Sequence, residues 1–81
     1  MTNEEIFQTV SRLMCEQLNI EESSVSMETS FEEVEADSVD MVELVMGIEE
    51  AFDMDEIADS DLEGMKTVGD LVGYIAGKVN D

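Results

Sequence analysis

The sequence contains no histidine, no proline and no tryptophan, and Cys15 is its single cysteine. The lack of histidine excludes a Cys–His nucleophile pair and a zinc site of the usual kind. One cysteine cannot form an internal disulfide. A chain of 81 residues is expected to be one domain, residues 1–81, and domains near this size bury only about 60% of the surface that the unfolded chain exposes. So little core argues against a stand-alone enzyme with an enclosed active site.

Basic residues are also scarce. Arg12, Lys66 and Lys78 oppose 22 acidic residues, which gives a net charge of −19. Nucleic-acid phosphates and anionic membrane surfaces would repel such a chain, so we expect neither as a partner. Basic protein surfaces and divalent cations are the natural partners. No apolar run approaches the ~20 residues of a membrane span, so membrane insertion is not expected and the sequence predicts a cytoplasmic monomer.

Hydrophobic residues make up 43% of the chain, and they recur at helical spacing. Thr2 and Glu5 are spaced as a capping box at the start of a first helix, which Asn19 can end in the left-handed conformation. A second helix is expected over about residues 39–52, with Asp37 or Ser38 as its N-cap. The apolar arc of this second helix consists of Met41, Leu44, Val45, Ile48, Ala51 and Phe52.

Two further helices are expected after residue 58. Asp59 or Ser60 can cap a short third helix, with Ser60 and Glu63 spaced as a capping box, and Gly64 would end it. Thr67 and Asp70 are spaced in the same way for a fourth helix. A long connection, residues 20–36, precedes the second helix, and we expect three apolar residues to pin it to the core: Ile20, Val25 and Phe31. The pattern predicts an all-α fold, a four-helix bundle with three main helices and one short helix.

The segment 35–44, Glu-Ala-Asp-Ser-Val-Asp-Met-Val-Glu-Leu, carries the most specific signal. It places the Ser38 hydroxyl at the N-terminus of the second helix. Backbone amides and the helix dipole favour a phosphate there. Serine also caps helices without any further function, so the local pattern leaves both interpretations open.

The motif Asp37-Ser38-Val39-Asp40, with the helix that follows it, resembles the Asp-Ser-Leu motif and second helix of acyl carrier proteins. The resemblance extends over nearly the whole chain, through Glu16-Gln17-Leu18, Ser30-Phe31 and Thr67-Val68. It implies a carrier and not an enzyme. A phosphopantetheinyl transferase would attach 4′-phosphopantetheine to Ser38, and the arm would hold acyl intermediates as thioesters for fatty-acid or related polyketide biosynthesis.

The resemblance also implies a docking surface along the second helix. Its partners would be the transferase, acyl transferases and ketoacyl synthases, through basic patches. The docking residues carried over by position are Asp37, Val39, Asp40, Glu43, Met46, Glu49 and Glu50. Residues that could shelter the acyl chain between the helices are Phe31, Val45, Ile48, Leu62 and Ile75. The sequence departs from the family in the turn before the motif, where Val34-Glu35-Ala36 replaces the usual Leu-Gly-Ala.

Three alternatives compete with this interpretation. An EF-hand-like calcium loop could use Asp59, Asp61, Glu63 and Asp70, although its last ligand is Asp where a bidentate Glu is normal. A carrier for polyketide or peptide assembly would share the serine chemistry and differ in cargo. A catalytic role for Ser38 beside acidic residues would lack a histidine base.

Overall fold

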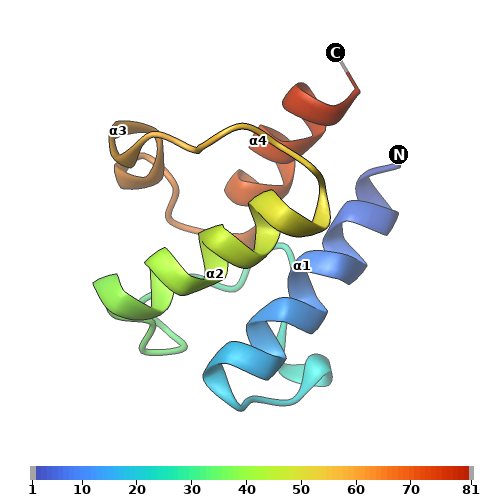
Figure 1. Ribbon diagram of the computed structural model, residues 1–81. Coiled ribbons are helices and arrows are strands. Elements are labelled where there is room, and N and C mark those ends of the chain that lie inside the picture. The colour runs from blue at the N-terminus through green and yellow to red at the C-terminus, as the bar shows by residue number, and fades with distance from the viewer. Residues whose placement is uncertain (1, 81) are drawn as a thin grey trace.

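The computed structural model describes residues 2–80, apart from the side chain of Asp59 (Figure 1). Within that range the chain forms four α-helices, one short 3₁₀-helix and no β-strand, which confirms the predicted all-α class. The elements are α1 (Asn3–Leu18), η1 (Glu22–Ser24), α2 (Ser38–Ala51), α3 (Asp59–Glu63) and α4 (Val68–Val79). None of these helices is long and apolar enough to cross a bilayer.

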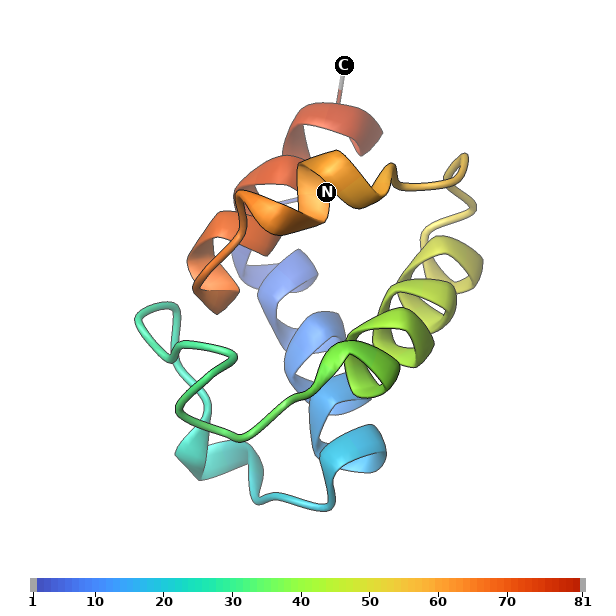
Figure 2. The ribbon, with the colours of Figure 1, turned by 90° about the vertical axis from the view of Figure 1, so that its left-hand side faces the viewer.

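Helix α1 is the centre of the packing. It lies against both α2 and α4, and its fully buried stripe includes Ile6, Val10 and Met14. Figure 2 shows α1 running across the direction of α2 and α4, with the three long helices around a common interior. That interior also contains these buried residues: Val25, Phe31, Leu44, Val45, Ile48, Phe52, Ile57, Val68, Leu71, Val72 and Ile75.

Side-chain caps start α1 and α4 as predicted. The Oγ1 atom of Thr2 accepts a hydrogen bond from the amide of Glu5 at 3.1 Å, and Asn19 ends α1 with a φ of 57°. Thr67 and Asp70 form the reciprocal box at the start of α4. Each box satisfies amides that the first turn of a helix leaves without partners.

The predicted cap of α3 is wrong. Helix α3 begins at Asp59 with Ala58 as its N-cap and no side-chain cap. Asp59 and Ser60 therefore both lie inside the helix, and Ser60 does not form a capping box with Glu63. The helix starts earlier because the amide of Asp61 already donates to the carbonyl of Ala58 at 3.0 Å. Gly64 ends the helix as expected.

Helix α2 begins one residue before the predicted start and ends one residue before the predicted end. Most of its apolar arc is buried or half-buried, but Ala51 is exposed, contrary to the prediction. At 100° per residue Ala51 lies about 60° from Ile48, at the edge of the arc. A methyl side chain at that edge is too short to reach the core.

The connection 20–36 is fastened to the start of α4. Ser30 and Thr67 form an isolated antiparallel bridge, and the amide of Phe31 donates to the carbonyl of Lys66 at 3.0 Å. Val25 and Phe31 are buried and Ile20 is half-buried, as predicted. The connection is therefore an ordered part of the fold that leads directly into Ser38.

Candidate functional site

Ser38 is the exposed first residue of α2, and Asp37 is the residue that caps this helix. The Oδ1 atom of Asp37 accepts a hydrogen bond from the amide of Asp40 at 2.9 Å. In return, the Oδ2 atom of Asp40 accepts from the amide of Asp37 at 3.4 Å. Because Asp37 supplies the cap, the Ser38 hydroxyl is free for other chemistry. The local alternative, a serine that serves only as the cap, does not hold in this structure.

The position of Ser38 suits a phosphate ester. The first amides of α2 have no partners within the helix, and the helix dipole makes this end positive. An anion attached at the Ser38 oxygen would lie beside those amides. The carboxylates of Asp37 and Asp40 oppose it in part, but each is engaged with a backbone amide.

An open groove of about 410 Å³ begins at Ser38. Apart from Ser38 and Glu63, its lining is apolar and comes from α2, α3 and the segments that flank them: Phe31, Met41, Val42, Leu62 and Met65. A second groove of about 260 Å³ shares Val42 and Leu62 with the first and includes Val45. Together they offer a flexible apolar arm or chain a surface next to its attachment point.

The predicted acyl-sheltering residues do not all reach these grooves. Phe31 and Leu62 line the groove at Ser38, and Val45 lines its neighbour. Ile48 and Ile75 are completely buried in the core, with no exposed surface. They support the fold and lie outside both groove linings.

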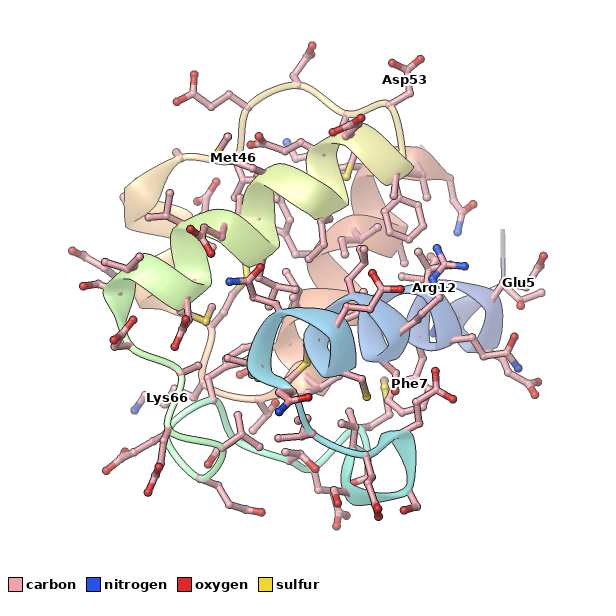
Figure 3. The ribbon with its side chains drawn as sticks, turned by 60° about the horizontal axis from the view of Figure 1, so that its bottom comes forward. Glu5, Phe7, Arg12, Met46, Asp53 and Lys66 are labelled. Carbon is pink, nitrogen blue, oxygen red and sulfur yellow. The ribbon has the colours of Figure 1, made fainter. Side chains whose placement is uncertain are left out.

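The outward face of α2 carries apolar residues among acids, as predicted. Val39 is 64% exposed and Met46 is 61% exposed, and Figure 3 shows Met46 on the outer side of the helix. Val42, 51% exposed, belongs to the same face and was missed. Its spacing, three residues after Val39 and four before Met46, was the signal that could have found it.

The predicted acidic docking residues differ in their surroundings. Asp37, Glu43 and Glu50 are exposed, while Asp40 and Glu49 are half-buried. The side-chain amide of Gln17 on α1 donates to the Glu43 carboxylate. Glu49 accepts a hydrogen bond from the backbone amide of Ile57 at 2.6 Å. With the reciprocal cap bonds of Asp37 and Asp40, four of the five acids therefore also have hydrogen-bond partners within the fold.

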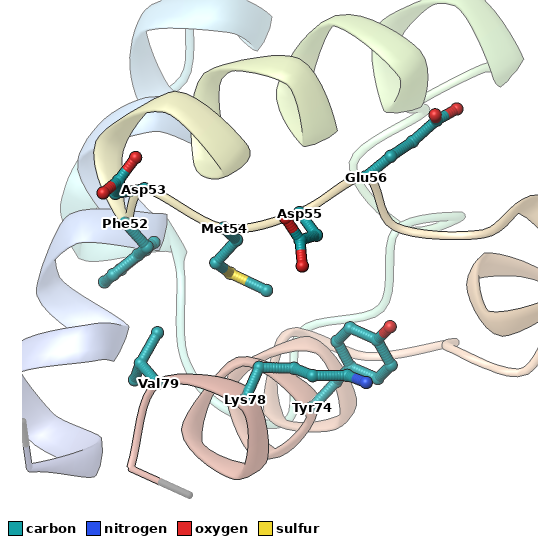
Figure 4. Close-up of a pocket in the computed structure, with 8 residues that line it drawn as sticks. All are labelled: Phe52, Asp53, Met54, Asp55, Glu56, Tyr74, Lys78 and Val79. Carbon is teal, nitrogen blue, oxygen red and sulfur yellow. The ribbon is translucent and has the colours of Figure 1, made fainter.

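A separate hollow of about 420 Å³ lies between the segment after α2 and the last turns of α4 (Figure 4). The Nζ atom of Lys78 is 5.5 Å from the ring centroid of Tyr74, a cation–π distance. The Tyr74 hydroxyl donates to Asp61 at 2.9 Å, and burial together with this bond raises the pKa of Tyr74. This hollow shares no lining residue with the groove at Ser38.

Two residues of the calcium alternative, Asp61 and Asp70, have other partners. Asp61 accepts the Tyr74 hydroxyl, and Asp70 accepts the amides of Lys66 and Thr67 at 3.0 and 3.2 Å. The side chain of Asp59 lies outside the described part of the chain. Among the side chains that the structure describes, no three acidic, cysteine or histidine groups form a cluster that could hold a metal.

Cys15 packs half-buried against the core, as a thiol outside the apolar stripe of α1. Burial and the nearby Glu22 carboxylate raise its pKa. The thiolate is the reactive form of cysteine, so a raised pKa makes this group a poor nucleophile. Cys15 is not among the residues that line the groove at Ser38.

Comparison with known proteins identifies the class of this site. A family model described as a phosphopantetheine attachment site matches residues 8–75. An acyl carrier protein of Prochlorococcus marinus (strain MIT 9515) is 48% identical over 79 residues, covering 96% of this chain and 98% of the relative. The chain belongs to the acyl carrier protein family, whose members carry a covalently attached 4′-phosphopantetheine and are carriers and not catalysts.

Proposed function

We propose that Ser38 is the attachment residue and that the chain, as a single domain over residues 1–81, carries acyl groups for fatty-acid or related polyketide biosynthesis in the cytoplasm. The assignment rests on the structural setting of Ser38. Ser38 is the exposed first residue of α2, its hydroxyl is left free by the Asp37 cap, and it opens onto an apolar groove. The site lies within the segment that the family model matches.

Attachment of the arm and its accommodation involve different groups around Ser38. A phosphopantetheinyl transferase would join the Ser38 oxygen to the phosphorus that carries the pantetheine arm of coenzyme A. The pyrophosphate bond of coenzyme A would break, adenosine 3′,5′-bisphosphate would leave, and the hydroxyl proton would be lost. When bound, the prosthetic group supplies a terminal thiol that holds acyl groups as thioesters. The amides at the start of α2 favour the attached phosphate. Phe31, Val42 and Leu62 offer an apolar wall beside it.

The outer face of α2 supports docking on basic partners. Its acids are Asp37, Asp40, Glu43 and Glu50, and its exposed apolar residues are Val39, Val42 and Met46. Acids around an apolar strip suit brief encounters, because the charges steer the approach and the apolar groups provide modest affinity. We expect the transferase, acyl transferases and ketoacyl synthases to bind here.

The test is attachment of the arm to the purified apo-protein. Incubation with a phosphopantetheinyl transferase and coenzyme A should add the mass of one phosphopantetheine, as measured by intact mass spectrometry. Ser38→Ala should abolish the gain, and Ser23→Ala, which changes an exposed serine of η1, should leave it intact. A gain that survives Ser38→Ala, or no gain with several transferases, would refute the proposal.

A further inference from the structure

Helix α3 stands apart from the other helices (Figure 1). Within residues 2–80, no Cα atom of α3 lies within 8 Å of a Cα atom of α1, α2 or α4. Close backbone packing therefore does not fix its place, and side chains must do so. Leu62 and Met65 pack half-buried against the core. The hydroxyl of Tyr74, on α4, donates a hydrogen bond to the carboxylate of Asp61, on α3, at 2.9 Å.

Glu49 provides the connection from α2. Its Oε2 atom accepts a hydrogen bond from the backbone amide of Ile57 at 2.6 Å. Ile57 lies two residues before α3, and its side chain is only 3% exposed. A carboxylate acceptor makes a shorter and stronger bond to an amide than a neutral acceptor does. This bond therefore holds the segment that leads into α3 on the last turns of α2.

The same residues form the wall of the grooves. Glu49, Ile57 and Leu62 line the groove of about 260 Å³, which shares Leu62 and Val42 with the groove at Ser38. If the bond to Ile57 breaks, the wall formed by residues 57–62 loses its tie to α2. The separation of that wall from Val42 then changes, and with it the width of both grooves.

We propose that Glu49 is a positioning residue, which acts as a hydrogen-bond acceptor for Ile57 and fixes the α3 wall of the groove, and that it is not a docking charge. That the groove receives the arm or its acyl chain rests on the proposed function of Ser38. The hydrogen bond between Glu49 and Ile57 does not depend on that function. The neighbouring Glu50 is exposed and makes a matched comparison. Its charge faces solvent, where a basic partner can reach it.

The experiment separates the acceptor from the charge. Glu49→Gln removes the charge and keeps a carbonyl acceptor, while Glu49→Ala removes both; Glu50→Gln and Glu50→Ala are the controls. Hydrogen exchange of the Ile57 amide is followed by NMR on the ¹⁵N-labelled apo-protein. We expect exchange to rise about tenfold or more in Glu49→Ala, as loss of a hydrogen bond allows. It should rise clearly less in Glu49→Gln than in Glu49→Ala, because the neutral carbonyl still accepts the bond but holds it more weakly. It should stay near wild type in both Glu50 variants.

A second measurement is the KM of a phosphopantetheinyl transferase for each apo-variant. Removal of a docking charge slows the steered encounter, so Glu50→Gln should raise KM more than Glu49→Gln does. The proposal is overturned if Glu49→Gln raises KM as much as Glu50→Gln, or if Ile57 exchange in Glu49→Ala equals that of wild type. If Glu49→Ala does not fold by circular dichroism, Glu49→Gln decides: loss of Ile57 protection in that variant overturns the proposal.

The exchange measurement does not depend on modification of Ser38. If no transferase modifies the protein, the proposed function fails while the Ile57 result still stands or falls by itself. If modification succeeds and Ile57 exchanges freely in wild type, the proposed function stands and the positioning role of Glu49 is refuted.

Discussion

Gly69 approaches the backbone of Met27 so closely that it has no room for a side chain. Its amide donates to the Met27 carbonyl oxygen at 2.8 Å, and a Cβ atom on Gly69 would come 2.9 Å from that same oxygen. Together with the bridge between Ser30 and Thr67, this contact fastens the connection before Ser38 to the first turn of α4.

Gly69→Ala should therefore destabilise the protein, by about 1–3 kcal/mol, because the added methyl forces backbone apart in a packed region. The measurement is the free energy of unfolding from urea titration. Gly73→Ala is the matched control, since nothing lies within 4 Å of a Cβ atom there. It should stabilise α4 by up to about 1 kcal/mol, as alanine does in a helix. Equal effects of the two substitutions would contradict this account of the contact.

Glu35 adopts a φ of 59° in the turn before Ser38. This is the position where the family usually has glycine, and a residue with a Cβ atom is strained there by about 1–2 kcal/mol. Glu35→Gly should raise the free energy of unfolding by up to about 1 kcal/mol, because glycine relieves the strain but gains freedom in the unfolded chain. Urea titration of both proteins measures this difference in the free energy of unfolding.

The control for this substitution is Glu33→Gly. Glu33 lies in the same turn and is not among the residues with positive φ. With no strain to relieve, glycine should lower stability at this position. If Glu35→Gly is as destabilising as Glu33→Gly, the left-handed backbone at Glu35 is not a source of strain.

The cap of α4 should make part of the stability depend on pH. The amides of Lys66 and Thr67 hold the pKa of the Asp70 carboxyl below its ordinary value of 3.8. A carboxyl with a lowered pKa in the folded state stabilises the fold above its ordinary pKa, and this stability is lost as the pH falls through the folded-state pKa. Asp70→Asn should thus cost more stability at pH 6 than at pH 2, measured by denaturation. An equal cost at both values would contradict the prediction.

The net charge of −19 should make the protein sensitive to salt. Mutual repulsion of the carboxylates opposes the compact state, and ions screen it. The melting temperature should rise as sodium chloride is added at neutral pH, most steeply up to about 0.1 M, where the screening length is about 10 Å. A melting temperature that is constant or falls with salt would show that repulsion does not limit stability.

The local sequence predicted those parts of the fold that depend on neighbours along the chain. The caps at Thr2 and Thr67, the left-handed Asn19 and the buried stripe of α1 all follow from spacings of three or four residues. The same reasoning failed at Ser60. A backbone hydrogen bond to the Ala58 carbonyl decides the start of α3, ahead of the residues that the cap pattern indicated.

For the site, the sequence by itself determined the position of Ser38 at a helix start, the exposed strip of Val39 and Met46, and the family. These depend on residue order and helical period alone. The cap by Asp37 is local as well, because its partner Asp40 lies three residues later. Only the tertiary structure decided that Ser38 opens onto a groove lined by Phe31 and Leu62. It also decided that Ile48 is core and not groove, and that Glu49 binds Ile57 eight residues later. Such contacts depend on where separate segments meet in space, which no helical period specifies.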